Sequence, residues 1–363
     1  MQTQTFNDTL FESRRQEHLA EIRQLFSGYM QRPDEVKEDL FLSFSEWEGA
    51  KTQKKPGFSL AEHKLLFGPS EIDEQKGGYF LRLEETGIVF NPGNDFFERL
   101  FQQGFTLFDI DLVIASSNGA ATKQVLSVIH ALNRELNRTL LSYEQEPHVI
   151  RFLLHPELYS EISAELRPEY RQERHSVIAL ETYAGTSDEE SYAIDKDLTL
   201  YYTNTQEEAI ALRLETKKAS IGLLTGAGWQ EKLKRFFASC TIMLSGIGKT
   251  PAEDLEMVTL QTGNLGYFGL CQMLHALPGL ELVLLSEFSR QDGDIRLELI
   301  KKLTQEQESQ AKILPLDSGF CLSLDRLTVA TANNKSAHYQ EVSVVRAEGA
   351  FAKLLYVAKD DLI

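Results

Sequence analysis

Ten short apolar segments between residues 77 and 286 restrict the fold of this 363-residue chain more than any other feature. They are rich in Val, Ile, Leu, Phe and Tyr, and glycine or small polar residues stand at many of their ends, a pattern typical of buried β-strands. Most of the middle of the chain must therefore lie in β-sheets. In chain order the segments are GGYFLRL, TGIVFNPG, IDLVIAS, VIRFLL, HSVIAL, LTLYYTN, AIALRLE, SIGLLTG, CTIMLSG and LELVLLS.

Helical patterns fall between these segments. Consecutive strands come first, and strands and helices then alternate, which is typical of sheets packed between helices. The predicted helices cover residues 95–103, 123–136, 230–237, 266–277 and 294–304.

The N-terminal part has a different pattern, with apolar residues at helical spacing from Phe6 to Met30 and a stop before Pro33. The sequence KTQKKPG then resembles a linker. We therefore predict a helical extension and linker over residues 1–57 and a main domain over residues 58–363. Residues 156–196, rich in Glu, Arg and Tyr, are predicted to be a surface insertion. The apolar stripe of the N-terminal helix must pack on this chain or on another, and both remain open.

Composition excludes several classes of protein. A formal net charge of -17 argues against direct nucleic-acid binding, which depends on cationic surfaces. No apolar run is long enough to cross a membrane, and the N-terminus lacks the pattern of a secretory signal. We therefore expect a cytoplasmic protein without membrane contact. Cys240, Cys271 and Cys321 lie far apart in apolar surroundings, which favours reduced thiols.

Common catalytic motifs are absent or incomplete. No two of the eight histidines lie within four residues of each other, and there is no GxSxG sequence. The segment SGIGKT, residues 245–250, resembles the end of a phosphate-binding loop, but Met243 occupies the position of its first glycine. We interpret these glycines as a tight turn after a buried strand.

The segment DIDLVIASSNGAATKQVLSVI, residues 109–129, has the strand, turn and helix of an enzyme's catalytic loop. Yet residues 116–122 provide no imidazole, thiol or carboxylate. Glu287, at the end of an apolar strand, is the acid that most resembles a catalytic group. Pairing with Arg290 or Arg296 is the structural alternative for it.

Five separated segments together resemble the metallo-β-lactamase fold, an αββα sandwich of two sheets between helices. GGYFLRLEETGIVFNPG resembles the opening hairpin with its DPG turn, and residues 109–133 resemble the strand, HxHxDH loop and helix. SIGLLTGAGW resembles the strand that ends in TGDT, CTIMLSGIG the next strand, and GNLGYFGL the late HLG turn. In that family, histidines and aspartates hold metal ions that activate a water molecule.

The resemblance implies that the metal-ligand positions of this chain carry small or neutral residues. Asn91 stands at the acid of the DPG turn. Asp109 and Asp111 remain, and we expect them to accept backbone hydrogen bonds without metal. No cofactor or metal is therefore expected. The former ligand positions are Ser117, Gly119, Ala121, Thr122, Asn204, Ala227 and Asn264.

These substitutions favour a catalytically inactive member of the fold that acts as a binding or regulatory subunit. We expect a bacterial multi-component system, such as one in stress or phage defence, with another protein or a second copy as partner, held through the helix Phe6 to Met30. One alternative is a sensor that binds a small, nucleotide-like ligand in the vestigial pocket, lined by Ser117, Asn118, Thr122, Asn204, Thr205 and Asn264. Ser116 and Glu287 are further candidate ligand-binding residues. Another is a metal-independent hydrolase that uses Glu287, Asp317 or the hydroxyls of residues 116–117, although no base lies near them in sequence.

Overall fold

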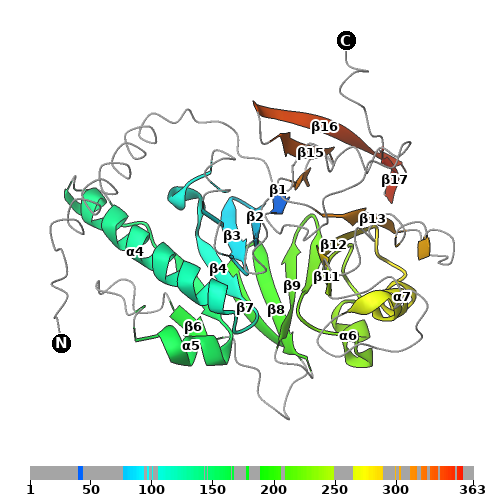
Figure 1. The fold of residues 1–363 in the computed structure, drawn as a ribbon, viewed down its shortest axis with the longest axis horizontal. Coiled ribbons are helices and arrows are strands. Elements are labelled where there is room, and N and C mark those ends of the chain that lie inside the picture. The colour runs from blue at the N-terminus through cyan, green and yellow to red at the C-terminus, as the bar shows by residue number, and fades with distance from the viewer. Residues whose placement is uncertain are drawn as a thin grey trace, which may run out of the picture. The chain divides into compact units, whose positions relative to one another are not determined.

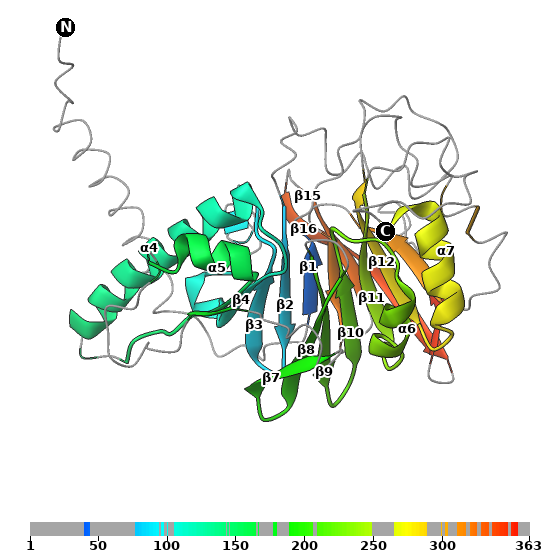
Figure 2. The ribbon, with the colours of Figure 1, turned by 90° about the horizontal axis from the view of Figure 1, so that it is seen from below.

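Two β-sheets lie face to face in a computed structural model of the chain, with helices on both outer sides (Figures 1 and 2). The described residues are 40–43, 77–93, 96–97, 100, 105–142, 144, 146–164, 166, 177–179, 189–205, 209–248, 265–288, 299, 302–303, 311–316, 320–324, 328–333, 336–347 and 350–354.

The first sheet has ten strands within these residues. Strands β3 to β6 are parallel to one another, whereas β1 and β2 pair with antiparallel neighbours. In spatial order the strands are β17 (Ala350–Leu354), β16 (Ser336–Ala347), β15 (Thr328–Asn333), β14 (Phe320–Ser323), β1 (Leu40–Ser43), β2 (Tyr79–Leu83), β3 (Thr86–Phe90), β4 (Leu112–Ala115), β5 (Arg151–Leu154) and β6 (Val177–Ala179).

Among the described residues, the second sheet has seven strands, of which β10 to β13 are parallel. Its order is β13 (Lys312–Pro315), β12 (Leu282–Phe288), β11 (Ile242–Gly248), β10 (Ser220–Leu224), β9 (Ile210–Thr216), β8 (Leu198–Asn204) and β7 (Glu190–Asp195).

Alternation along the strands explains the sandwich. Leu212, Leu223 and Leu244 of the second sheet point into a core shared with Ile88 and Ile114 of the first. Because side chains in a strand alternate between the two faces, their neighbours point outward. These outward residues of the second sheet form a second apolar cluster with helices α6 (Glu231–Phe236) and α7 (Gly266–Ala276).

The other outer side carries α4 (Ala120–Ser142) and the shorter α5 (Pro156–Ile162), as Figure 2 shows. A short 3-10 helix, η1 (Leu107–Asp109), precedes β4. Along α4, Val125, Leu126 and Ile129 are buried at helical spacing, whereas Val128 is 43% exposed. This amphipathic spacing makes α4 a covering helix.

The ten predicted strands are all present, and the predicted helices over residues 123–136, 230–237 and 266–277 appear as α4, α6 and α7. For the predicted helices over residues 95–103 and 294–304, only isolated positions are described, and those are helical. The N-terminal helix lies outside the described residues. The αββα fold class is therefore confirmed by the two sheets and their covering helices.

Three expectations need correction. Residues 40–43, assigned to the extension, form β1 and pair with both β2 and β14.

The predicted surface insertion over residues 156–196 contributes α5, β6 and β7, and both strands are paired within the sheets. The prediction was wrong because β6 and β7 are the edge strands of the two sheets, and edge elements carry charged residues on their exposed face. The glycines of residues 245–250 make no turn within the described part, since β11 continues to Gly248 beside Phe288.

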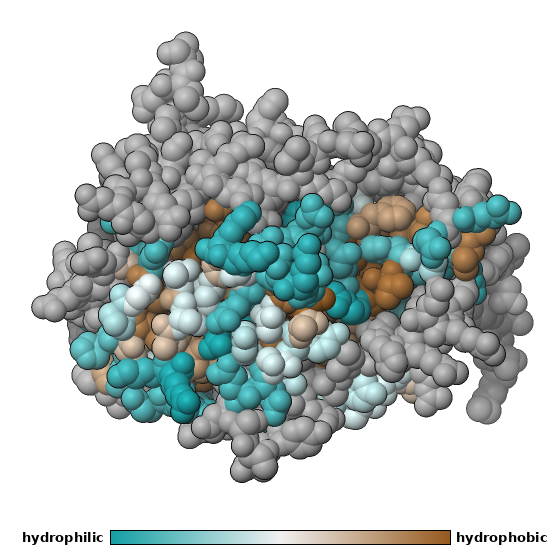
Figure 3. Space-filling model, turned by 180° about the vertical axis from the view of Figure 1, so that it is seen from behind, coloured by the Kyte–Doolittle hydropathy of each residue, from teal (hydrophilic) through white to brown (hydrophobic). Residues whose placement is uncertain are grey.

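The described surface seen from behind is mainly hydrophilic, with hydrophobic side chains gathered in separate places (Figure 3). Among the described helices, none is both long and apolar enough to span a membrane.

Candidate functional site

The carboxyl ends of β3, β4 and β10 meet around the side chain of Asn91. The Asn91 Nδ2 group donates to Ser116 Oγ at 2.9 Å and to Thr225 Oγ1 at 3.1 Å. Its Oδ1 atom accepts from the Ser116 backbone N–H at 2.9 Å and lies 3.3 Å from Ser116 Oγ. An asparagine amide offers two N–H donors and an oxygen with two lone pairs. All of these groups are engaged, so Asn91 forms a saturated, neutral hydrogen-bond network.

The backbone of Asn91 suits this position. Its φ is 44°, in the left-handed region that asparagine enters more readily than most residues other than glycine. The Asn91 N–H donates to Ile114 O at 2.9 Å, which joins the turn after β3 to β4. The turn thereby directs the amide toward the second sheet.

Two further polar contacts join the sheets near this network. The Ile210 N–H at the start of β9 donates to Ser116 O at 2.9 Å. Tyr79 of β2 donates its hydroxyl hydrogen to Ser286 Oγ of β12 at 2.7 Å, and this contact is buried. Neutral groups therefore hold the two sheets together at this edge of the sandwich.

Glu287 is the ionisable side chain beside these strand ends. It accepts a hydrogen bond from the Gly226 backbone, next to Thr225 in the network. Burial of the carboxyl raises the pKa of Glu287 to about 7, and the hydrogen bond from Gly226 only partly opposes this shift. The residue as a whole keeps intermediate exposure, so solvent reaches part of its surface.

The predicted pocket residues do not all converge on Asn91. Ser116 contacts it, but Ser117, Gly119 and Ala121 lie just before α4 or in its first turn, with intermediate exposure. Thr225, which also contacts Asn91, was not among the predicted residues. Thr122 is almost fully buried on the first turn of that helix.

The loop after β8 is divided. Asn204 is exposed at the end of the strand, whereas Thr205 is buried and its hydroxyl donates to Ala209 O at 2.7 Å. Ala227 lies in the apolar cluster beneath α6 and α7, and Asn264 lies outside the described residues.

Asn118 is exposed and faces α5, not the network. Its Nδ2 group donates to Glu161 Oε1 at 3.1 Å and lies 3.4 Å from Glu157 Oε2. Hydrogen bonds from Lys123 and Asn118 lower the pKa of Glu161. Asn118 thus joins the β4–α4 loop to α5, a role that its place in the loop sequence does not indicate.

Asp109 and Asp111 behave as expected. Thr106 N and Thr106 Oγ1 donate to Asp109 Oδ2 at 2.9 and 3.0 Å, and Gly87 N donates to Asp111 Oδ2 at 2.7 Å. Both acids lie before β4, at the opposite end of the strand from Ser116. The prediction that they accept backbone hydrogen bonds is confirmed.

The residues around Asn91 do not fit a catalytic zinc ion. Zinc sites use three or four imidazole, thiolate or carboxylate ligands that converge on one point. Here the hydroxyls of Ser116 and Thr225 are bonded to an amide, and Glu287 is the carboxylate beside them. Within the part of the chain that the structure describes, no three His, Cys, Asp or Glu side chains could hold a metal ion. No catalytic step is therefore assigned to a metal.

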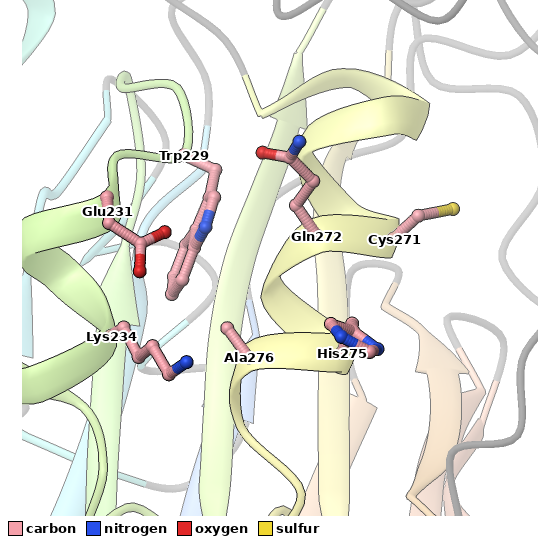
Figure 4. A pocket seen from close by; sticks show the side chains of 7 residues that line it. All are labelled: Trp229, Glu231, Lys234, Cys271, Gln272, His275 and Ala276. Carbon is pink, nitrogen blue, oxygen red and sulfur yellow. The ribbon is translucent and has the colours of Figure 1, made fainter.

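A separate pocket of about 390 Å³ lies between α6 and α7, on the outer side of the second sheet. In Figure 4, Trp229 stands between Glu231 and Lys234 on one side and the residues of α7 on the other, while Cys271 points away. Trp229 is only 4% exposed, which leaves little ring surface for stacking. The lining residues are Trp229, Glu231, Lys234, Cys271, Gln272, His275 and Ala276.

Solved structures with a similar fold belong to metallo-β-lactamase-fold proteins. The metallo-β-lactamase-fold protein YhfI from Bacillus subtilis is 12% identical, with a TM-score of 0.54. The match covers 78% of this chain and 99% of the YhfI chain. A diphosphatase from the PhnP family is 10% identical, with a TM-score of 0.51, over 79% of this chain and 97% of its own. A long-form RNase Z from yeast is 9% identical, with a TM-score of 0.52, over 82% of this chain and 42% of its own.

No family model and no curated protein sequence matches the chain. At these identities, the similarity establishes the metallo-β-lactamase fold, as the sequence resemblance predicts. It does not transfer an activity, because function depends on site residues and not on the fold.

Proposed function

We propose that this chain is a metal-free metallo-β-lactamase-fold protein that acts by binding, as a regulatory subunit of a bacterial multi-component system. The observation that carries the proposal is the saturated amide of Asn91, which bonds Ser116 and Thr225 where strand ends from both sheets meet. A metal centre needs free lone pairs directed at one point. Here the polar groups use their lone pairs on one another, so they stabilise the sandwich.

The same contacts count against a serine nucleophile. Ser116 Oγ accepts from Asn91 Nδ2 and is completely buried. A hydroxyl becomes nucleophilic when a neighbouring base removes its proton, and an amide is not such a base. A metal-independent hydrolase built on Ser116 is therefore the weaker candidate.

The sensor hypothesis keeps one supporting observation, the Glu287 carboxyl beside the network, which is buried although the residue as a whole has intermediate exposure. Binding of a small ligand there is compatible with a regulatory role. Both readings predict a protein that binds and does not hydrolyse.

The test is purification of the full chain from its native host under gentle conditions, followed by elemental analysis and activity assays. We expect no stoichiometric zinc, manganese or iron, no change in melting temperature with chelator, and no hydrolysis of phosphodiester or β-lactam reporters with added zinc. We also expect a second protein, or a second copy, to remain bound during purification. About one metal per chain, removed by chelator with loss of stability, would contradict the metal-free site. Recovery of the bare monomer would contradict the subunit role.

A further inference from the structure

The backbone of Glu287 has a conformation that residues other than glycine rarely adopt. Its φ is 57°, at a position where β12 is paired with β11 on both sides of it. A non-glycine residue in the left-handed region is strained, and such residues cluster at functional sites. Only the surrounding structure can maintain this conformation.

Gly246 of the neighbouring strand makes room for the Glu287 carboxyl. A Cβ atom at Gly246 would lie 2.1 Å from Glu287 Oε2 and 2.8 Å from its Cδ, which is closer than atoms can approach. The same Cβ position lies 3.4 Å from Thr225 Cα. The carboxyl therefore lies across the face of β11, beside the residue that accepts from Asn91.

Among the described residues, one group donates a hydrogen bond to this carboxyl, the Gly226 backbone N–H. An ionised carboxylate has about four lone-pair sites, and the Gly226 N–H uses one of them. No charged side chain of the described residues contributes to the raised pKa of Glu287. On the elements that pack against it, the facing residues Thr225, Gly226 and Gly246 are uncharged. A buried carboxylate with one donor is stabilised either by a proton or by a cation.

We propose that Glu287 binds the ammonium group of a small primary amine at the carboxyl end of β12. An ammonium group has three N–H donors and needs one carboxylate plus neutral oxygen acceptors, such as the backbone carbonyls of neighbouring strand ends. A metal ion would need several converging ligands, which the described residues do not provide. The formal net charge of -17 also favours a cationic ligand. Glu287 as a whole has intermediate exposure, so solvent reaches part of this residue.

This inference deepens the proposed function, because it concerns the same metal-free site. The two proposals can be refuted separately. If no amine binds, the amine proposal is wrong and the metal-free site is unaffected, whereas a metal found at the site contradicts the proposed function.

The experiment is calorimetric titration of the full chain at pH 8 with 1,4-diaminobutane and ethanolamine. 1,4-Butanediol serves as the neutral control, and tetramethylammonium, a cation without N–H donors, controls for attraction to the net negative charge. We expect saturable binding of at least one amine and of neither control compound. In Glu287→Gln the affinity should fall on the order of tenfold, since a hydrogen bond to a charged group is lost. Glu146→Gln, which changes an exposed acid in the loop before β5, should bind like the unmodified chain.

Binding should also weaken between pH 8 and pH 6, because protonation of Glu287, whose pKa is raised to about 7, removes the negative charge. The proposal is overturned if no amine binds, if tetramethylammonium binds equally well, or if Glu287→Gln leaves the affinity unchanged. Circular dichroism of Glu287→Gln verifies that the variant is folded. If the variant is unfolded, the test is the pH dependence of amine binding to the unmodified chain. Equal binding at pH 6 and pH 8 then refutes the proposal.

Discussion

Asp109 and Glu287 are both acids at strand ends, but the protein surrounds them differently. Asp109 precedes β4, and its fully buried side chain accepts two hydrogen bonds from Thr106 and lies 3.6 Å from the Arg82 guanidinium. Glu287 stands at the opposite, carboxyl end of the parallel strands, where a backbone N–H of Gly226 is its donor. Asp109 thus has its counterion and its donors within the chain, whereas Glu287 has one neutral donor among the described residues.

The difference separates a structural acid from a candidate binding acid. Taking a carboxylate out of water is unfavourable unless hydrogen bonds and an opposite charge replace the solvent. At Asp109 the fold provides both, so the acid has no remaining capacity for a ligand. At Glu287 the fold provides space, through Gly246, and one donor. The remaining capacity can be filled by a proton or by a ligand.

The largest expected effect is at the structural acid. Asp109→Ala removes a carboxylate from beside the buried Arg82 guanidinium and removes the acceptor of both Thr106 groups. We expect the free energy of unfolding to fall by about 3 to 5 kcal/mol, the range for breaking a buried ion pair. Denaturant unfolding measures it. Asp195→Ala, at an exposed acid of β7, is the control and should change stability by less than about 0.5 kcal/mol. Equal effects of both variants would remove the contrast on which the comparison rests.

Asn91 lies on the Glu287 side and tests whether neutral groups hold that edge together. Asn91→Ala leaves Ser116 and Thr225 without their partner and places alanine at a φ of 44°. We expect a loss of about 2 to 3 kcal/mol in unfolding free energy from unsatisfied buried groups and backbone strain. Asn91→Gly loses the same hydrogen bonds without the strain and should be about 1 kcal/mol more stable than the alanine variant. Asn118→Ala, at an exposed amide, is the matched control. A loss at Asn91 no larger than at Asn118 would show that the network does not stabilise the edge.

The smallest expected effect is a pH dependence assigned to Glu287. The pKa of this residue rises from an ordinary value of 4.5 to about 7 on folding. Between these values the folded protein holds a proton that the unfolded chain has released, so the contribution to stability is complete below pH 4.5 and is lost as the pH rises through 7. The loss should be about 1 to 2 kcal/mol, less than the full linkage value because part of the residue is exposed. Glu287→Gln lacks this titration, so its unfolding free energy relative to the unmodified chain should rise over that interval. A difference that stays constant from pH 4.5 to pH 7 would contradict the assignment.

Local pattern determined much of the fold. The ten apolar segments became strands because they are short, rich in β-branched and aromatic residues, and in many cases bounded by glycine or small polar residues, which suits burial in a sheet. The spacing of Val125, Leu126 and Ile129 likewise defined α4. Small neutral residues at positions 116–122 also indicated, from the sequence alone, a loop without strong metal ligands. These features depend on neighbours within a few residues, which a sequence displays directly.

Only the tertiary structure decided which strand ends meet. Ser116 and Thr225 lie 25 and 134 residues after Asn91 in the sequence, and no local pattern joins the three residues into one network. Four-residue β1 gives no strong signal by itself and becomes a strand because β2 and β14 provide hydrogen bonds on both sides. Gly246 reads as a turn glycine in SGIGKT, yet its missing side chain accommodates the Glu287 carboxyl from the next strand. The physical reason is the same in each case: hydrogen bonding and steric exclusion act between atoms that are close in space, and sequence separation does not measure that distance.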